Sequence, residues 1–236
     1  MVPRSPLLLV PLAVAVAASL AVIAPPVAAQ WDESGSFDVS IDGRPAGTEE
    51  FTIRRTGTGE TAETTAVGRV QLRLATGSLE ISPRLRTTGG ETRPVAYQVE
   101  VGGEAPRTIV GTVGAGRFTA RIQTATGEQM REYVASEGAV ILDDGVAHHY
   151  RFVAERAGEG RIPVLIPREN RQVMVDIADG GRSRTTVAGQ EVQARRLTLR
   201  GTNFPERHVW IDGSNRVLRV EIPSTGYVAV RDALPE

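Results

Sequence analysis

The sequence contains no cysteine and no lysine, and aromatic residues make up only 5% of its 236 positions. Without cysteine the chain can form no disulfide and has no thiol nucleophile, so its stability must come from an ordinary core. The 27 basic residues, all arginine, nearly balance 28 acidic residues. A general nucleic-acid binder would need a basic surplus, so nucleic acid is excluded as an expected partner. The scarcity of aromatic rings also argues against a platform for stacking sugars.

The first 29 residues have the pattern of a secretory signal peptide. Arg4 precedes an apolar run from Leu7 to Ile23, and the small residues Val27-Ala28-Ala29 end the segment. We expect cleavage after Ala29 and a periplasmic or extracellular mature chain with no integral membrane span. An uncleaved membrane anchor is the alternative. Residues 30–236 are long enough to bury a sizeable core as a single β-rich domain, which we expect to be a monomer.

Alternation of apolar and polar residues dominates the rest of the chain. It is clearest in Phe37-Val39-Ile41, Val70-Leu72-Leu74 and Val95-Tyr97-Val99-Val101, each followed by a glycine-containing turn. Period-2 runs with such turns are typical of antiparallel strands joined by hairpins, with one apolar face. We therefore predict an all-β fold: a curved antiparallel sheet or open β-barrel with one central helix packed against it.

Helical spacing interrupts the strands in one place. An i, i+3, i+4, i+7 stripe is formed by Val146, His149, Tyr150 and Val153. The stripe predicts a helix over residues 144–157, with Asp143 or Asp144 as its N-cap and Gly158 just past its end. This helix is the natural cover for the mouth or the concave face of the sheet.

The adjacent histidines in this helix do not form a recognisable catalytic or metal site. Neighbouring helix residues point about 100° apart, and the i, i+4 spacing of zinc helices is absent. We expect His149 to be packed beneath the helix and His148 to lie at the surface or rim. The sequence also lacks a G-x-S-x-G motif, so it predicts no catalytic residue, metal ligand or cofactor. A hydrolytic enzyme of unknown class, using His149 with a carboxylate, stays open as an alternative.

Three details of the second half carry further expectations. Pro163 and Pro167 bracket an apolar run, which predicts an edge or irregular strand. The alternation shifts between Ala194 and Leu197, which predicts a bulge near Arg195-Arg196. Trp210 has two readings: its indole faces a ligand, or it packs across the strands.

Several segments together resemble a family of secreted bacterial β-proteins of unknown function. These segments are the opening "FDVSIDGRPAG", the helical "DDGVAHHYRFVAER", the apolar "IPVLIP", the strand "VAGQEVQARRLTL" and the hairpin "VWIDGSNRVLRVEI". More loosely, the chain is similar to the envelope lipoprotein-carrier class, in which an unclosed β-barrel is plugged by helices and holds acyl chains. The resemblance implies an open-barrel fold and transfers no catalytic residue.

The leading functional expectation is a non-enzymatic binding module for a hydrophobic ligand, such as a lipid or acyl chain. A one-sided apolar sheet that one helix cannot cover would leave an apolar cavity beneath a helical lid. The predicted ligand-contact residues are Val146, His149, Tyr150, Val153 and Trp210. The alternative is a filled interior, which would make the protein an envelope interaction or accessory module with a protein partner.

Overall fold

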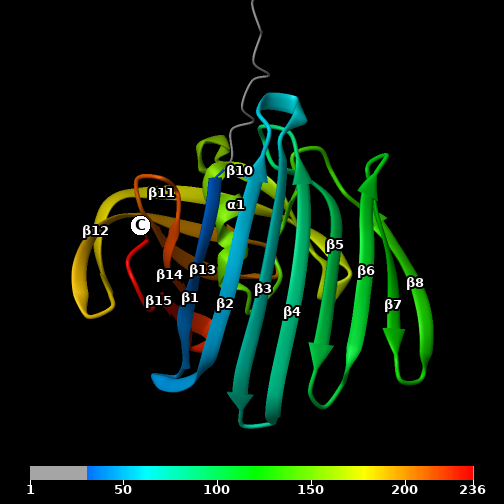
Figure 1. Cartoon of the computed structure of the whole chain (residues 1–236), viewed down its shortest axis with the longest axis horizontal. Coiled ribbons are helices and arrows are strands. Elements are labelled where there is room, and N and C mark those ends of the chain that lie inside the picture. Colours follow the sequence, from blue (N-terminus) through cyan, green and yellow to red (C-terminus); the bar gives the residue numbers. More distant parts are fainter. Residues whose placement is uncertain (1–30, 236) are drawn as a thin grey trace, which may run out of the picture.

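The computed structural model describes residues 31–235, so the predicted signal segment and its cleavage site lie outside the described residues. Within them, the alternating runs form one continuous sheet (Figure 1). Its strands are β1 (Trp31–Ile41), β2 (Arg44–Thr56), β3 (Glu63–Leu74), β4 (Gly77–Thr88), β5 (Arg93–Gly102), β6 (Arg107–Gly114), β7 (Arg117–Thr124), β8 (Gly127–Val134), β9 (Val140–Ile141), β10 (Arg161–Ile166), β11 (Arg171–Val187), β12 (Gln190–Gly201), β13 (Phe204–Ile211), β14 (Val217–Ile222) and β15 (Tyr227–Arg231).

The strand order is β8-β7-β6-β5-β4-β3-β2-β1-β15-β14-β13-β12-β11-β10-β9, so the first and last strands of the chain lie side by side. All described pairs are antiparallel except β9 with β10, which are parallel. The two ends of the sheet, β8 and β9, do not pair with each other, and the barrel stays open. Side-chain contacts bridge the opening, because Gln172 of β11 bonds both the backbone N–H (2.7 Å) and the hydroxyl (2.8 Å) of Ser136. The predicted fold class is confirmed.

Two short hairpins follow the expected turn chemistry. Asp42 and Gly43 both have positive φ, 49° and 73°, which is the backbone of the tight turns that match strand twist. In the last hairpin, Oδ1 of Asp212 accepts hydrogen bonds from the N–H groups of Ser214 and Arg216, each at 2.8 Å. These local bonds satisfy the turn and fix the register of β13 against β14.

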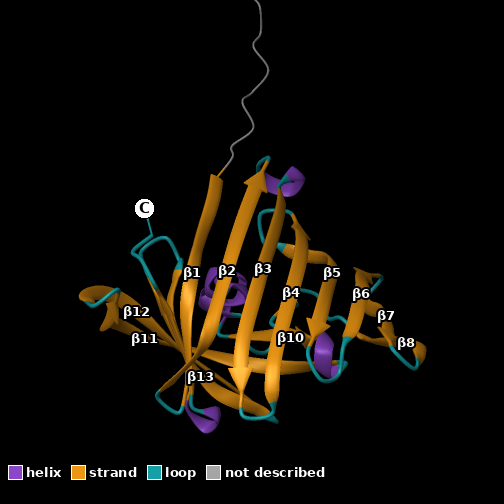
Figure 2. Cartoon of the chain, turned by 60° about the horizontal axis from the view of Figure 1, so that its bottom comes forward, coloured by secondary structure: helices purple, strands orange, loops and turns teal. Residues whose placement is uncertain are grey.

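The helical segment is shorter than predicted and is divided into three pieces: η2 (Ala147–His149), α1 (Tyr150–Glu155) and η3 (Ala157–Glu159). The prediction of one helix over 144–157 capped by Asp143 or Asp144 is wrong. Gly145 has a φ of 73°, so the chain turns there, and Val146 occupies the N-cap position without a side-chain cap. Both aspartates bond elsewhere, as described below. In Figures 1 and 2 the segment lies behind β1–β3, enclosed by the curved sheet.

The predicted bulge exists, but on the partner strand. The register of β11 against β12 passes from Asp179↔Leu197 to Arg182↔Arg195, so the extra residue belongs to β11. Gly180 and Gly181 form the irregular stretch, and Gly181 has a φ of 69° that favours glycine. The prolines of β10 predicted an edge or irregular strand. β10 is next to last in the sheet, and its neighbour on the outer side is the two-residue β9.

One apolar core fills the concave side of the sheet, and glycines in the strands make room for large side chains there. A Cβ on Gly68 of β3 would lie 2.6 Å from Cε1 of His148. Similarly, a Cβ on Gly35 would collide with Arg231, and one on Gly111 with the ring of Phe118. These three positions let side chains press against the backbone of the sheet, as close-packed interiors require.

Candidate functional site

The start of the helical segment is held by a buried carboxylate from the opposite strand. Glu49 of β2 is 0% exposed. It accepts the backbone N–H groups of Ala147 (2.6 Å) and His148 (2.8 Å) and faces Nδ1 of His148 at 2.7 Å. Because a carboxylate can only accept, the ring Nδ1 carries the donated proton. Glu49 therefore supplies the cap that Asp143 and Asp144 were expected to give, and it ties the helix to the sheet.

His148 is buried, which corrects its predicted place at the surface or rim. Its side chain is 0% exposed. The ring stacks on Phe51 with centroids 5.4 Å apart and planes 1° apart, and it occupies the space left by Gly68. Within the described residues, Nε2 of His148 has no hydrogen-bond partner. The prediction assumed that adjacent helix residues point in different directions. Here both histidines lie in the 3-10 turn that passes into α1, and both rings point inward.

His149 is packed beneath the helix, as predicted. It is 0% exposed, and its Nδ1 accepts the backbone N–H of Asp143 at 3.3 Å. The ring meets Tyr97 edge-on, with centroids 5.8 Å apart. Burial, followed by the nearby His148 and Arg168, holds the pKa of His149 well below its usual value. The ring is therefore neutral at physiological pH.

The two aspartates that were expected to cap the helix instead anchor it to the barrel wall. Asp143 accepts the hydroxyl proton of Tyr97 at 2.7 Å, and its Oδ2 lies 2.9 Å from Nε of Arg168. Burial, followed by the charge of Asp143, raises the pKa of Tyr97 well above its usual value. Asp144 pairs with Arg207 at 2.5 Å. Both contacts join the loop before the helix to residues far away in the sequence.

Arg207 is the largest fully buried side chain in the described residues, with 1% exposure. It donates to the hydroxyl of Tyr150 at 2.8 Å and to Asp144, and its guanidinium lies 4.1 Å from the ring centre of Phe204. Burial alone would raise the pKa of Asp144, but Arg207, Glu169 and Arg168 together outweigh it and the net pKa is lowered. Arg207 thus joins β13 to the loop before η2, through Asp144, and to the first residue of α1, Tyr150.

A second buried ion pair closes the seam between the first and last strands. Arg231 of β15 pairs with Glu33 of β1 and donates to the carbonyl of Val217 at 3.0 Å. Its guanidinium also lies 4.7 Å from the ring centre of Phe51. Burial raises the pKa of Glu33, and Arg231 offsets part of that rise. The pairing β1–β15 is thus fixed by charge as well as by backbone hydrogen bonds.

The predicted ligand-contact residues do not form one group. Val146, His149, Tyr150 and Val153 lie together in the core beneath the helix. Trp210 belongs to a separate cluster on the other face of β11–β14, with Val187, Ala194 and Leu218. Its ring lies between Arg196 and Arg219, each 5.7 Å from its centre, on the neighbouring strands. Of the two readings of Trp210, cross-strand packing fits this geometry.

The interior polar residues Glu49, Arg168, Arg207 and Arg231 were not predicted from the sequence. Glu49 left a usable signal, because it stands on the inward face of β2 between Gly47 and Phe51. A charge on an apolar alternating face is a candidate buried partner. Nothing in the local pattern says which distant group it meets.

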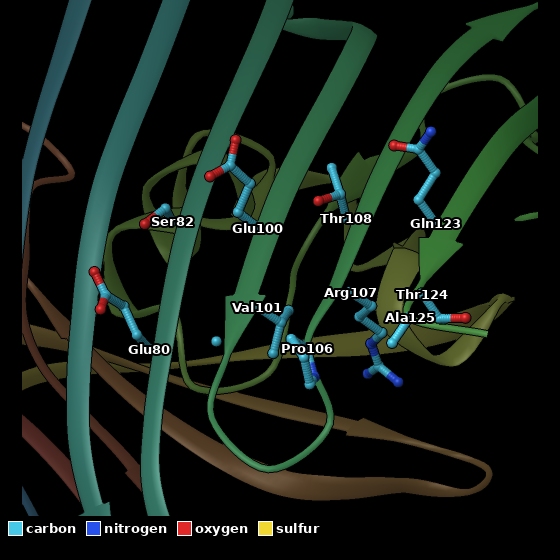
Figure 3. Close-up of a pocket in the computed structure, with 11 residues that line it drawn as sticks. Glu80, Ser82, Glu100, Val101, Pro106, Arg107, Thr108, Gln123, Thr124 and Ala125 are labelled. Carbon is cyan, nitrogen blue, oxygen red and sulfur yellow. The ribbon is translucent and has the colours of Figure 1, made fainter. Parts of the chain in front are cut away.

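Several surface hollows of the described residues lie on the outer face of the sheet and at its rims. One, of about 590 Å³, crosses β4–β7 (Figure 3). Its floor is a cross-strand row of polar residues in direct register, Ser82↔Glu100↔Thr108↔Gln123. Val146, Tyr150 and Val153 line none of these hollows. Among residues 31–235, no three metal-ligating side chains come together.

Comparison with known proteins supports the fold and no activity. No protein-family model matches the chain, and no curated protein matches it. Among solved structures, the chain is similar to a beta-barrel-like protein of domain of unknown function DUF1849 from Brucella abortus. The TM-score is 0.50 with 6% sequence identity, over 87% of this chain and 97% of that one. At this identity the likeness concerns the fold alone, and the neighbour is described as a domain of unknown function.

Proposed function

We propose that the protein is an exported, non-enzymatic interaction module whose interior is filled by its own helix and buried ion pairs. The burial of the helical segment carries this proposal. Val146, Tyr150 and Val153, the residues expected to touch a guest, are 0%, 2% and 1% exposed. A helix packed this closely and bonded through Glu49, Asp143 and Asp144 has the contacts of a plug. A lid would need contacts that are easily broken.

Binding of a hydrophobic ligand inside the barrel stays a prediction, and the described geometry favours the filled alternative. An apolar guest needs dry apolar space. Here the concave side contains Glu49, His148 and Arg207 beside the apolar core, and Gly68 leaves the room that the ring of His148 occupies. A guest would have to displace the helix and leave several buried charges without partners, which is strongly unfavourable.

A non-enzymatic role is supported by the inaccessibility of the most reactive groups. Catalysis by His148 or His149 would need contact with a substrate. Both rings are buried, and the carboxylate beside His148 is already bonded to two backbone N–H groups and to the ring itself. Their arrangement supports a structural role in locking the helix.

Export is proposed from the N-terminal segment alone, with its apolar run and small-residue end. Among residues 31–235, no helix is long and apolar enough to cross a bilayer. An exported module with a filled barrel has its outer face to offer to a protein partner. The polar row across β4–β7 lies on that face, as does the exposed Val110, two residues along β6 from Thr108.

Native mass spectrometry of the purified protein with palmitate tests the filled interior. The proposal predicts the mass of the unliganded chain. A 1:1 palmitate complex that Val153→Asp abolishes would overturn it.

Two further experiments test export and the outer face. N-terminal sequencing should show that the exported protein begins at or near Gln30. A photo-crosslinking residue at Val110 should give a discrete protein adduct in cells, whereas one at the equally exposed Met174 of β11 should not.

A further inference from the structure

A small pocket of about 210 Å³ lies at one mouth of the barrel, where β3 to β6 end. Its lining includes Leu74, Leu79, Val101, Glu104, Arg107 and Arg168. We propose that this mouth pocket binds a small carboxylate with a short apolar chain. The site lies at the rim, so it is compatible with a filled interior and goes beyond the interaction role proposed above.

Arg107 is the residue of this pocket that would bind an anion. It begins β6 two residues before the buried Ile109, at the rim of the sheet, where it lines both the mouth pocket and the hollow of Figure 3. Its Nε is buried without a hydrogen-bond partner, and it forms no ion pair within the described residues. Figure 3 shows its guanidinium apart from the carboxyl groups of Glu80 and Glu100, of which Glu80 pairs with Arg69. Arg107 is partly buried, and an unpartnered guanidinium favours an anion, for which a carboxylate is the best geometric match.

A second guanidinium lines the same pocket. Arg168, in the 3-10 turn η4 (Pro167–Glu169), has a side chain that is 12% exposed, and it is neutralised by Asp143 behind it. The charge of Arg107 therefore remains to be balanced. Glu104 is the one acidic side chain that lines the pocket, and it would oppose a bound anion. Arg168 is already bonded to Asp143 and to the backbone carbonyl of Asp144, so Arg107 is the residue that would hold the carboxylate, with Glu104 limiting the affinity.

The pocket's shape and its apolar wall restrict the rest of the ligand. Leu74, Leu79 and Val101 form an apolar side, which suits a hydrocarbon chain and gives no advantage to phosphate or sulfate. A hollow of about 210 Å³ is smaller than the pockets that take drug-sized ligands, so it suits a small molecule, and pentanoate is a probe of suitable size.

The test is a titration of the complete mature protein with sodium pentanoate, followed by backbone NMR shifts of residues 76–78 and 102–105. Pentanol, which lacks the charge, and inorganic phosphate, which lacks the chain, serve as comparison ligands. The proposal predicts saturable shifts with pentanoate that are weaker by about tenfold or more for each comparison ligand, as expected when a charge-assisted contact or an apolar contact is lost.

Matched variants separate the site from general charge effects. Arg107→Gln should weaken pentanoate binding by about tenfold or more, because it removes the charged donor. Glu104→Gln should strengthen it. Arg182→Gln, which removes an exposed arginine that lines a different pocket, should leave it unchanged. The proposal is overturned by the absence of saturable pentanoate binding, by equal binding of phosphate, or by equal losses in the Arg107 and Arg182 variants. None of these results would change the predictions of the filled-interior proposal for palmitate and crosslinking.

Discussion

The concave face of this sheet is built in two different ways. In the central region, formed by β1–β3 and β13–β15 around the helical segment, the core contains Glu49, His148, Arg207 and Arg231. In the far region, formed by β6–β8, the buried positions of β6 and β7 are apolar or glycine, and β8 has one partly buried residue. Period-2 alternation runs through β6 and β7 as it does through the central strands. The comparison shows that period-2 alternation is enough to form the sheet. The buried charged residues determine how the helical segment is held against it.

The two regions should also differ in how much stability a substitution removes. An apolar region needs only volume to be filled, and it tolerates changes of shape at modest cost. A buried ion pair contributes little net stability when intact, but removing one partner is strongly destabilising because the other is left uncompensated. The central region should therefore respond to single substitutions much more sharply than the far region.

The largest effect is expected for Glu49→Ala. The change leaves the N–H groups of Ala147 and His148 and the ring of His148 without their acceptor in a buried site. We expect a loss of about 3–5 kcal/mol in the free energy of unfolding. Urea denaturation measures it, with Glu49→Gln as the matched control that keeps one acceptor oxygen and should lose less. A loss under about 1 kcal/mol, the scale of an average substitution, would place the helix outside the cooperative core.

His148→Ala should be the next largest. It removes a ring that packs on Phe51 and leaves the carboxylate of Glu49 with two of its three donors. We expect a loss of about 2–4 kcal/mol, compared with about 1–3 kcal/mol for His149→Ala. The same urea series measures both. Equal stability of wild type and His148→Ala would contradict the buried position of this ring.

Added methyl groups sharpen the comparison between the two regions. Gly68→Ala in the central region drives a Cβ to 2.6 Å from His148, and Gly111→Ala in the far region drives one into Phe118. Both should cost about 1–3 kcal/mol from overpacking. Gly68→Ala should be the worse of the two, because His148 cannot move without breaking its contact with Glu49. Gly114→Ala, with nothing within 4 Å of its Cβ, is the control and should be neutral in thermal unfolding. A larger loss at Gly111 would reverse the comparison.

The smallest effect is a pH dependence in the central region. The pKa of His149 is well below 6.5 in the folded state, so its contribution to stability is complete above that value. As the pH falls below about 6.5, the unfolded state binds a proton that the folded state refuses, and stability declines by up to about 1.4 kcal/mol per pH unit. Urea denaturation at neutral pH and at mildly acidic pH should show this decline in wild type and less of it in His149→Asn. Identical slopes would mean that His149 titrates normally in the folded chain.

The sequence predicts the strands and turns of the sheet far better than the polar contacts inside it. Strands such as Phe37-Val39-Ile41 and turns such as Asp42-Gly43 follow from local alternation and backbone preference, and both are found as expected. The burial of His149 also followed from the apolar stripe. The helix start did not, because its cap comes from Glu49, nearly a hundred residues earlier in the chain. The bulge was displaced by one strand for a related reason: the pattern of β12 records the irregularity, while the glycines that create it lie in β11.

Hydrogen exchange at the backbone amides of Ala147 and His148 tests the central claim most directly. If the helical segment is a plug bonded to β2 through Glu49, these two amides exchange only when the whole domain unfolds. Their opening free energy, measured by NMR, then equals the global free energy of unfolding from urea denaturation. Fast exchange of both amides under conditions where the amides of β2 stay protected would contradict the account, because the helix would then open as a lid over a separable interior.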